Sequence, residues 1–194
     1  MRDFVPAVGD IGLVRISGAT GQAIRVGQWL LARVDNFRAS RTVDVEDWAD
    51  YQHAFVYLGN GQLIEAEPGG ARIRPLSEYD GTTIYWCSNI SAGLSDQQRQ
   101  IIAFNAQTFL GTPYSFLDYV ALTAHKLRVW LPGLRAYISS THRMICSQLA
   151  DRAYDLAGVH IFADGRDPGD VDPLDIFLRD KQLGRLIWPG PRAV

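Results

Sequence analysis

Cys146 and His53 are the two residues of this sequence that could together carry out nucleophilic catalysis, since a reactive cysteine needs a nearby base. Cys146 lies in RMICSQLADRAYDLAGV (residues 143–159), where apolar residues recur at the three- and four-residue spacing of an amphipathic helix. The dipole and unpaired N–H groups at the N-terminal end of a helix favour the reactive thiolate. On this helix alone, a buried structural cysteine is the alternative interpretation.

The ends of this predicted helix are marked in different ways. Gly158 predicts the end, because glycine readily adopts the left-handed conformation just past a last turn. The start has two solutions: a cap within residues 139–141, or an extended lead-in through Met144 and Ile145. Both solutions place Cys146 near the N-terminal end of the helix.

His53 is the candidate base, and Glu65 is the candidate group that orients its ring. His53 begins HAFVYLGNGQLIEAE (residues 53–67), two runs typical of strands on either side of Gly-Asn-Gly, which predicts a hairpin. A three-residue turn would pair residue 58 with 62, 55 with 65 and 53 with 67. His53, Glu65 and Glu67 would then lie on one face, with Glu65 diagonally across from the imidazole.

The length of this turn decides whether His53 meets Glu65. A two-residue turn at Asn60-Gly61 would pair residue 56 with residue 65 and direct Glu65 away from His53. Gly-Asn-Gly permits both turns, so the register stays open. The alternative interpretation is a His53 bonded to the backbone and a solvated Glu65.

The elements that must position these residues predict an α+β fold, with strands between two helical regions. Strands are expected at 9–18, 53–58, 62–66, 71–76 and 82–89, and helices at 21–34, 97–111 and 146–158. The helix at 97–111 is expected to be capped by Ser95 and Asp96, to end at Gly111 and to direct four residues inward: Ile101, Ile102, Ala106 and Phe109. Three stretches have other characters: 34–52 is polar and irregular, 112–140 is apolar, aromatic and partly helical, and 164–180 is a proline-rich tail.

Length and composition predict an ordinary globular protein. The 194 residues are 47% hydrophobic and 21% charged, which favours a single domain over 1–194 with a real core. A formal net charge of −2 without a basic run argues against a nucleic-acid partner. No stretch is long and apolar enough for a transmembrane segment. The N-terminus lacks the apolar core of a signal peptide, which predicts a cytoplasmic protein, released only by cell lysis or with a virion.

The cysteines and histidines predict neither a disulfide framework nor a metal site. Cys87 and Cys146 are too few for a framework, although a single bridge between them fits the sequence. CxxC and HExxH motifs are absent, and the histidines are scattered at positions 53, 125, 142 and 160. No metal and no cofactor are therefore expected.

Five stretches, in order, carry a resemblance to a known superfamily. They are VGDIGLVR, HAFVYLGNGQLIEAEPGGARIRPL, GTPYSFLDY, ICSQLADRAYDLAGV and VDPLDIFLR, which span about Val8 to Leu178. They resemble the opening strand, histidine segment, G-x-P-Y motif, nucleophile helix and closing segment of the circularly permuted NlpC-like papain superfamily. That superfamily includes bacterial cell-wall hydrolases and the lecithin retinol acyltransferase branch. His53 precedes Cys146 by 93 positions, which is the permuted order.

The resemblance implies a permuted papain-like fold, in which an antiparallel sheet packs against helices and the nucleophile stands at a helix N-terminus. It implies Cys146 as nucleophile, with its backbone N–H as an oxyanion donor, His53 as general base and Glu65 as third member. Glu67 is the fallback third member or a substrate contact, and Tyr114 of the G-x-P-Y motif would bind or orient substrate.

One departure from the superfamily concerns Phe55. The superfamily often has glycine two residues after the histidine, where this chain has a bulky ring. A tighter pocket beside the base and a differently packed strand are the two interpretations.

The implied function is a cysteine hydrolase that cleaves an amide through a thioester acyl-enzyme, with a small peptidoglycan-type peptide as substrate. An alternative is a lipid or fatty-acyl esterase, thioesterase or acyltransferase, which the apolar and aromatic stretch at 112–140 favours. A second alternative is an inactive binding module on the same scaffold. The sequence leaves the oligomeric state open.

Overall fold

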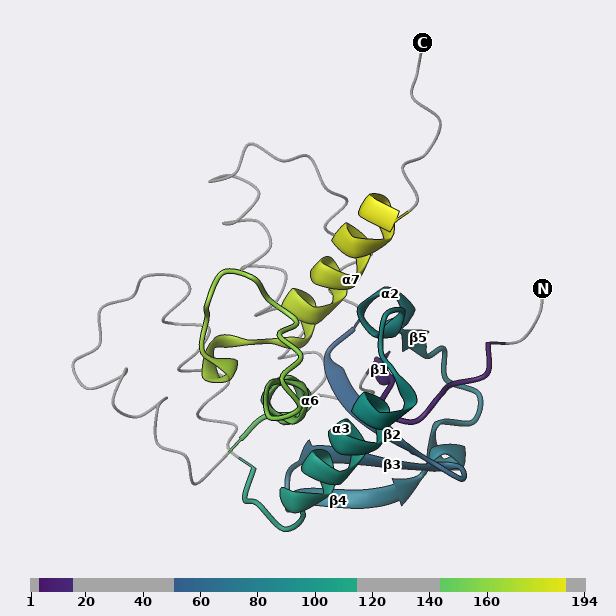
Figure 1. The fold of residues 1–194 in the computed structure, drawn as a ribbon. Coiled ribbons are helices and arrows are strands. Elements are labelled where there is room, and N and C mark those ends of the chain that lie inside the picture. The colour runs from purple at the N-terminus through teal and green to yellow at the C-terminus, as the bar shows by residue number, and fades with distance from the viewer. Residues whose placement is uncertain (1–3, 16–50, 115–143, 188–194) are drawn as a thin grey trace.

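The computed structural model of the chain describes residues 4–15, 51–114 and 144–187. These residues contain a five-stranded antiparallel sheet and several helices, which confirms the predicted α+β class (Figure 1). The predicted helix at 21–34, and most of the stretches at 34–52 and 112–140, lie outside the described residues.

The sheet has the strand order β4-β3-β2-β1-β5. Its strands are β1 (Ile11–Val14), β2 (His53–Gly59), β3 (Gln62–Glu67), β4 (Gly70–Pro75) and β5 (Tyr85–Trp86). Each predicted strand is present, although the first and last are shorter than expected. β2, which begins with His53, lies between β1 and β3, so its backbone is hydrogen-bonded on both sides.

The two faces of the sheet have different roles because successive side chains along a strand point to opposite faces. One face forms the main core through alternate residues of β1, β2 and β3: Ile11, Leu13, Ala54, Val56, Ile64 and Ala66. Helices α3 (Asp96–Thr108) and α6 (Cys146–Asp155) pack side by side on this face (Figure 1). The opposite face carries a smaller cluster of Val14, Phe55 and Leu63.

Helix α3 begins where its sequence predicts. The Ser95 hydroxyl accepts a hydrogen bond from the Gln98 N–H, and the Gln98 side chain accepts one from the Ser95 N–H, which makes a capping box. Ile102 and Ala106 are buried as expected, but Ile101 is 37% exposed, because the helix turns its neighbours toward α6. Gly111, in the left-handed conformation, follows the helix as predicted.

The prediction of a proline-rich tail at 164–180 is wrong. This stretch contains a 3-10 turn, η2 (Pro168–Asp170), and the first half of a long helix, α7 (Pro173–Ile187). Pro173 is tolerated as the first helical residue, where an N–H would lack an intrahelical partner anyway. Asp172 and Asp175 cap this end reciprocally, each carboxylate accepting the backbone N–H of the other.

The far part of α7 is held by Asp180, which is fully buried. Its carboxylate accepts hydrogen bonds from the Tyr85 hydroxyl, from the side chain and backbone of Asn89, and from the Ile90 N–H. Asn89 and Ile90 belong to the short helix α2 (Ser88–Ser91), so Asp180 joins α7 to α2 and β5.

Within the described ranges, no helix has both the length and the apolarity that crossing a bilayer requires.

Candidate active site

Cys146 is the first residue of α6. Ile145 before it is extended, with φ −99° and ψ 169°, and Met144 forms a parallel bridge with Tyr114. The extended lead-in is therefore the correct one of the two predicted starts. The predicted end is confirmed as well, because Gly158 takes a φ of 72° shortly after the last helical residue.

The start of α6 lacks a capping side chain because Ile145 has no polar atom beyond its backbone. Ser147 and Gln148 instead fasten the first turn to the segment around η2: the Ser147 hydroxyl donates to the Val171 carbonyl, and the Gln148 amide donates to the Gly169 carbonyl, each at 2.8 Å. Among the described residues, none accepts a hydrogen bond from the Cys146 N–H. That N–H is therefore available to donate a hydrogen bond to a negatively charged oxygen beside the sulfur.

The hairpin of β2 and β3 combines features of both predicted turns. Gly59 pairs with Gln62, so the turn has the two residues Asn60 and Gly61, both with positive φ. Leu58 is an extra residue on β2, because the next pair joins Tyr57 to Leu63.

This bulge returns the ladder to the register of a three-residue turn. Phe55 pairs with Glu65 as expected, whereas the expected pair of residues 58 and 62 is replaced, and the ladder ends before His53 and Glu67. Glu65 therefore lies on the same face as His53.

His53 and Glu65 form a buried hydrogen-bonded pair. His53 Nε2 lies 2.8 Å from Glu65 Oε2, and the two residues are 5% and 1% exposed. An ionised carboxylate can only accept, so Nε2 carries the proton of this bond. Nδ1 is then the ring nitrogen left for a second partner, and Cys146 lies close enough to influence the pKa of the imidazole.

The surroundings of His53 favour its protonated form. Burial has the largest effect on the pKa of His53 and lowers it, but the charge and hydrogen bond of Cys146, followed by those of Glu65, outweigh burial. Together these influences raise the pKa of His53 from 6.5 to about 10. His53 is therefore an imidazolium at neutral pH, paired with the buried Glu65 carboxylate.

Glu65 stays ionised in spite of its burial. Burial raises the pKa of Glu65, but the hydrogen bond and charge of His53 and the hydrogen bond from Tyr79 lower it well below its usual value. The Tyr79 hydroxyl donates to Glu65 Oε2 at 2.5 Å. Tyr79 is the site residue that sequence reasoning missed, because nothing in the local pattern marks a residue 14 positions beyond Glu65.

Phe55 packs on the face of β2 that carries His53. Its ring stacks on Tyr79 with centroids 5.4 Å apart and meets the edge of Trp86 at 5.5 Å. Gly12, its partner across the ladder, makes room for the ring, since a Cβ on Gly12 would lie 2.2 Å from Phe55 Cζ. Phe55 and Gly12 thus fit together as a large and a small residue on neighbouring strands.

Glu67 makes ion pairs with two arginines of β4. One of its carboxylate oxygens accepts hydrogen bonds from both Arg72 and Arg74, and Arg74 also pairs with Glu78. Of the two candidate third members, Glu65 is therefore the one bonded to His53.

Tyr114 lies beside the lead-in to α6. Its backbone forms the bridge to Met144, the Met144 N–H donates to the Pro113 carbonyl, and the Tyr114 ring packs against the main core. The segment around Pro113 and Tyr114 is thus next to the chain that leads into Cys146.

The second cysteine is separate from this group. Cys87 is buried and does not bridge to Cys146, so the single disulfide that the sequence allowed is not formed. Burial raises the pKa of the Cys87 thiol well above its usual value, as expected for a packed core residue. In the part of the chain that the structure describes, no three His, Cys, Asp or Glu side chains are grouped to hold a metal ion.

The group of Cys146, His53 and Glu65 has little contact with solvent, since Cys146 is 4% exposed. Low exposure strengthens the attraction between the charged groups because less water screens them.

Comparison of the chain with protein-family models, with curated proteins and with solved structures gives no match.

Proposed function

We propose that this chain is a cysteine hydrolase that uses Cys146 as nucleophile, His53 as general base and Glu65 as the residue that orients the base. The observation that carries the proposal is a single imidazole that is hydrogen-bonded to a buried carboxylate and lies close enough to Cys146 for the sulfur to raise its pKa. The position of that sulfur at the start of α6 adds support, because a helix N-terminus stabilises negative charge there.

The proposed reaction begins from a thiolate–imidazolium pair, in which His53 holds the proton of the Cys146 thiol and the Glu65 carboxylate stabilises the imidazolium. The thiolate attacks the carbonyl carbon of the substrate, and the electron pair of the C=O bond moves to oxygen. The Cys146 N–H donates to this oxyanion. The intermediate collapses to a thioester as His53 protonates the departing amine.

Water completes the cycle. His53 removes a proton from a water molecule, whose oxygen attacks the thioester carbonyl, and the carboxylic acid leaves as the sulfur recovers a proton from the imidazolium. We propose a small peptide amide of the peptidoglycan type as substrate, on the resemblance of the five motifs, with Tyr114 and Glu67 as substrate contacts. An ester or thioester would react by the same steps, so the assay must include all three.

The test is hydrolysis of a substrate panel followed by intact-protein mass spectrometry. The panel contains peptidoglycan fragments, fatty-acyl esters and fatty-acyl thioesters, and a trapped intermediate adds the acyl mass to Cys146. We expect Cys146→Ala and His53→Ala to abolish turnover while circular dichroism stays that of the folded wild type. Turnover that survives Cys146→Ala would refute the proposal.

Alkylation of the two cysteines provides a test that needs no substrate. At pH 6 a small reagent such as iodoacetamide should modify Cys146 faster than a free thiol, because His53 holds it as a thiolate. Cys87, buried and without a basic partner in the described residues, is the internal control and should stay unmodified.

His53→Ala should slow the modification of Cys146 by at least tenfold, since the partner that stabilises the thiolate is removed. If Cys146 reacts no faster than a free thiol in the folded wild type, an inactive binding module becomes the better interpretation.

A further inference from the structure

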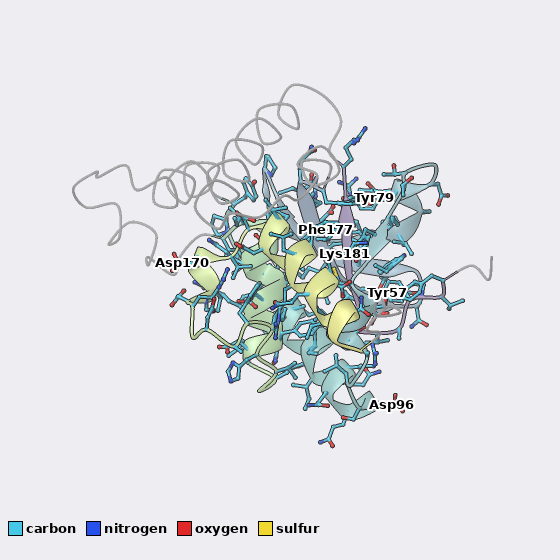
Figure 2. All side chains as sticks on the ribbon, turned by 90° about the horizontal axis from the view of Figure 1, so that it is seen from above. Tyr57, Tyr79, Asp96, Asp170, Phe177 and Lys181 are labelled. Atoms are coloured by element: carbon cyan, nitrogen blue, oxygen red, sulfur yellow. The ribbon has the colours of Figure 1, made fainter. Side chains whose placement is uncertain are left out.

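Tyr79 makes the closest contact with Glu65 outside the proposed triad. It is the last residue of the 3-10 turn η1 (Leu76–Tyr79), which follows β4 and returns the chain to the sheet. Its hydroxyl donates to Glu65 Oε2, the same oxygen that lies 2.8 Å from His53 Nε2. Figure 2 shows Tyr79 beside the strands of the sheet.

The Tyr79 ring is held by packing as well as by this bond. It stacks on the buried Phe55 ring at an interplanar angle of 14°, and Phe55 in turn fills the space that Gly12 leaves open. A continuous line of contacts therefore runs from Gly12 through Phe55 and Tyr79 to Glu65. Each member restricts the next, so the hydroxyl has one position relative to the carboxylate.

Toward the ionised Glu65 carboxylate, the Tyr79 hydroxyl is the donor at ordinary pH. Burial, followed by the negative charge of Glu65, raises the pKa of Tyr79 well above its usual value, so the phenol keeps its proton. A fixed donor on Oε2 holds that oxygen toward His53. Arg74 is a competing partner, since its Nε lies 3.8 Å from Glu65 Oε1, and a carboxylate freed from Tyr79 could rotate toward it.

We infer that Tyr79 is a positioning residue, which holds the Glu65 carboxylate against His53 and acts on the reaction only through that pair. The inference rests on the proposed function and adds a fourth side chain to it. Phe55, the residue that departs from the superfamily, supplies the surface on which the tyrosine ring is fixed.

Tyr79→Phe is the direct test because it removes the hydroxyl and keeps the stacked ring. We expect kcat to fall about tenfold with KM unchanged, the effect of losing one hydrogen bond to a charged group that does not touch substrate. The matched control is Tyr85→Phe, which removes a hydroxyl that donates at 2.7 Å to another buried carboxylate, that of Asp180. Tyr85→Phe should leave kcat unchanged, although it lowers thermal stability.

A second readout follows Glu65 itself. The ¹³C resonance of the Glu65 side-chain carboxyl reports its titration, and Tyr79→Phe should raise its pKa by about one unit, because the hydroxyl stabilises the charged form. Phe55→Leu should lower kcat in the wild-type background but add little in the Tyr79→Phe background, since both changes act through one hydroxyl.

The outcomes separate this inference from the function on which it rests. If Cys146→Ala abolishes turnover and Tyr79→Phe keeps the wild-type kcat, the role of Tyr79 is refuted and the proposed function stands, whatever the titration of Glu65. If Cys146→Ala leaves turnover intact, the proposed function fails. The effect of Tyr79→Phe is then measured by the alkylation rate of Cys146 at pH 6 in place of kcat. An alkylation rate unchanged by Tyr79→Phe would then refute the positioning role.

Discussion

At the scale of single residues, His53 and Glu65 depend on each other for their charge. Because each is buried, burial alone would favour the neutral form of each side chain. Together they are stable as an ion pair, with Tyr79 and Cys146 as further partners. Their pKa shifts have opposite signs, and both shifts therefore change the free energy of unfolding with pH.

The His53–Glu65 pair should give maximal stabilisation between about pH 4.5 and 6.5. The raised pKa of His53 contributes stability below its unfolded value of 6.5, and this is lost as pH rises toward about 10. The lowered pKa of Glu65 contributes stability above its unfolded value of 4.5, and this is lost as pH falls toward about 2. Between pH 6.5 and 10 the free energy of unfolding of the wild type should decrease by on the order of a few kcal/mol. Thermal unfolding should therefore show a melting temperature that falls over this range.

His53→Gln provides the comparison for this prediction, because the amide does not titrate. Its melting temperature should vary less than that of the wild type over the alkaline range. An identical alkaline slope in both proteins would contradict the assigned charge of His53.

Asp151, on α6, is a buried carboxylate that the proposed reaction does not use. It is 5% exposed, and burial, followed by the charge of Asp155, raises its pKa to about 7. The folded protein therefore binds an extra proton between pH 3.8 and about 7, and stability from this group falls as pH rises through that window.

Asp151→Asn should raise the melting temperature at pH 8, where the wild type carries a buried charge, and have little effect at pH 4. The stabilisation at pH 8 is on the order of a few kcal/mol. The same variant at the lower pH is the control for packing changes, and equal effects at both pH values would contradict the prediction.

At the scale of elements, α6 and the β2–β3 hairpin bring the candidate site together. The bulge at Leu58 sets the register that directs Glu65 toward His53, and the bonds of Ser147 and Gln148 hold the first turn of α6 in place. Helix α7 is tied to α2 and β5 through the hydrogen bonds of Asp180 and through the contacts of Phe177 and Lys181 with the Tyr85 ring. Phe177 and Lys181 mark the position of this helix in Figure 2.

Asp180→Ala should destabilise the protein by about 3 kcal/mol, because it leaves the N–H groups of α2 and the Tyr85 hydroxyl without their acceptor. Asp96→Ala is the control, since Asp96 is an exposed carboxylate in the first turn of α3. Its effect on chemical denaturation should stay below about 1 kcal/mol. Equal effects for the two variants would show that α7 does not depend on Asp180.

At the scale of the whole molecule, the sheet separates two environments. The helices α3 and α6 cover one face and pack with it in the main apolar core (Figure 1). The other face holds the aromatic group around Phe55 and the charged residues next to Glu65. Cys146, the first residue of α6, lies close enough to His53, the first residue of β2, to influence the pKa of its imidazole.

Local sequence determined the elements of this protein and the identity of two candidate residues. Hydrophobic spacing, Ser95 and Gly158 were sufficient for the helices α3 and α6, and β-rich runs were sufficient for the strands. Helix α7 was missed because its prolines suggested a tail, although Pro173 stands where a helix accepts proline. Cys146 and His53 stood out because their types and positions in these elements are local properties.

Tertiary structure alone decided which carboxylate meets the imidazole and what holds it there. Gly-Asn-Gly fits either turn, so the register followed from the bulge at Leu58, which packing of both sheet faces selects. Tyr79 reaches Glu65 only because η1 folds back over Phe55, a contact between residues distant in sequence. Local propensities act within a few residues, whereas these contacts depend on the free energy of the folded chain as a whole.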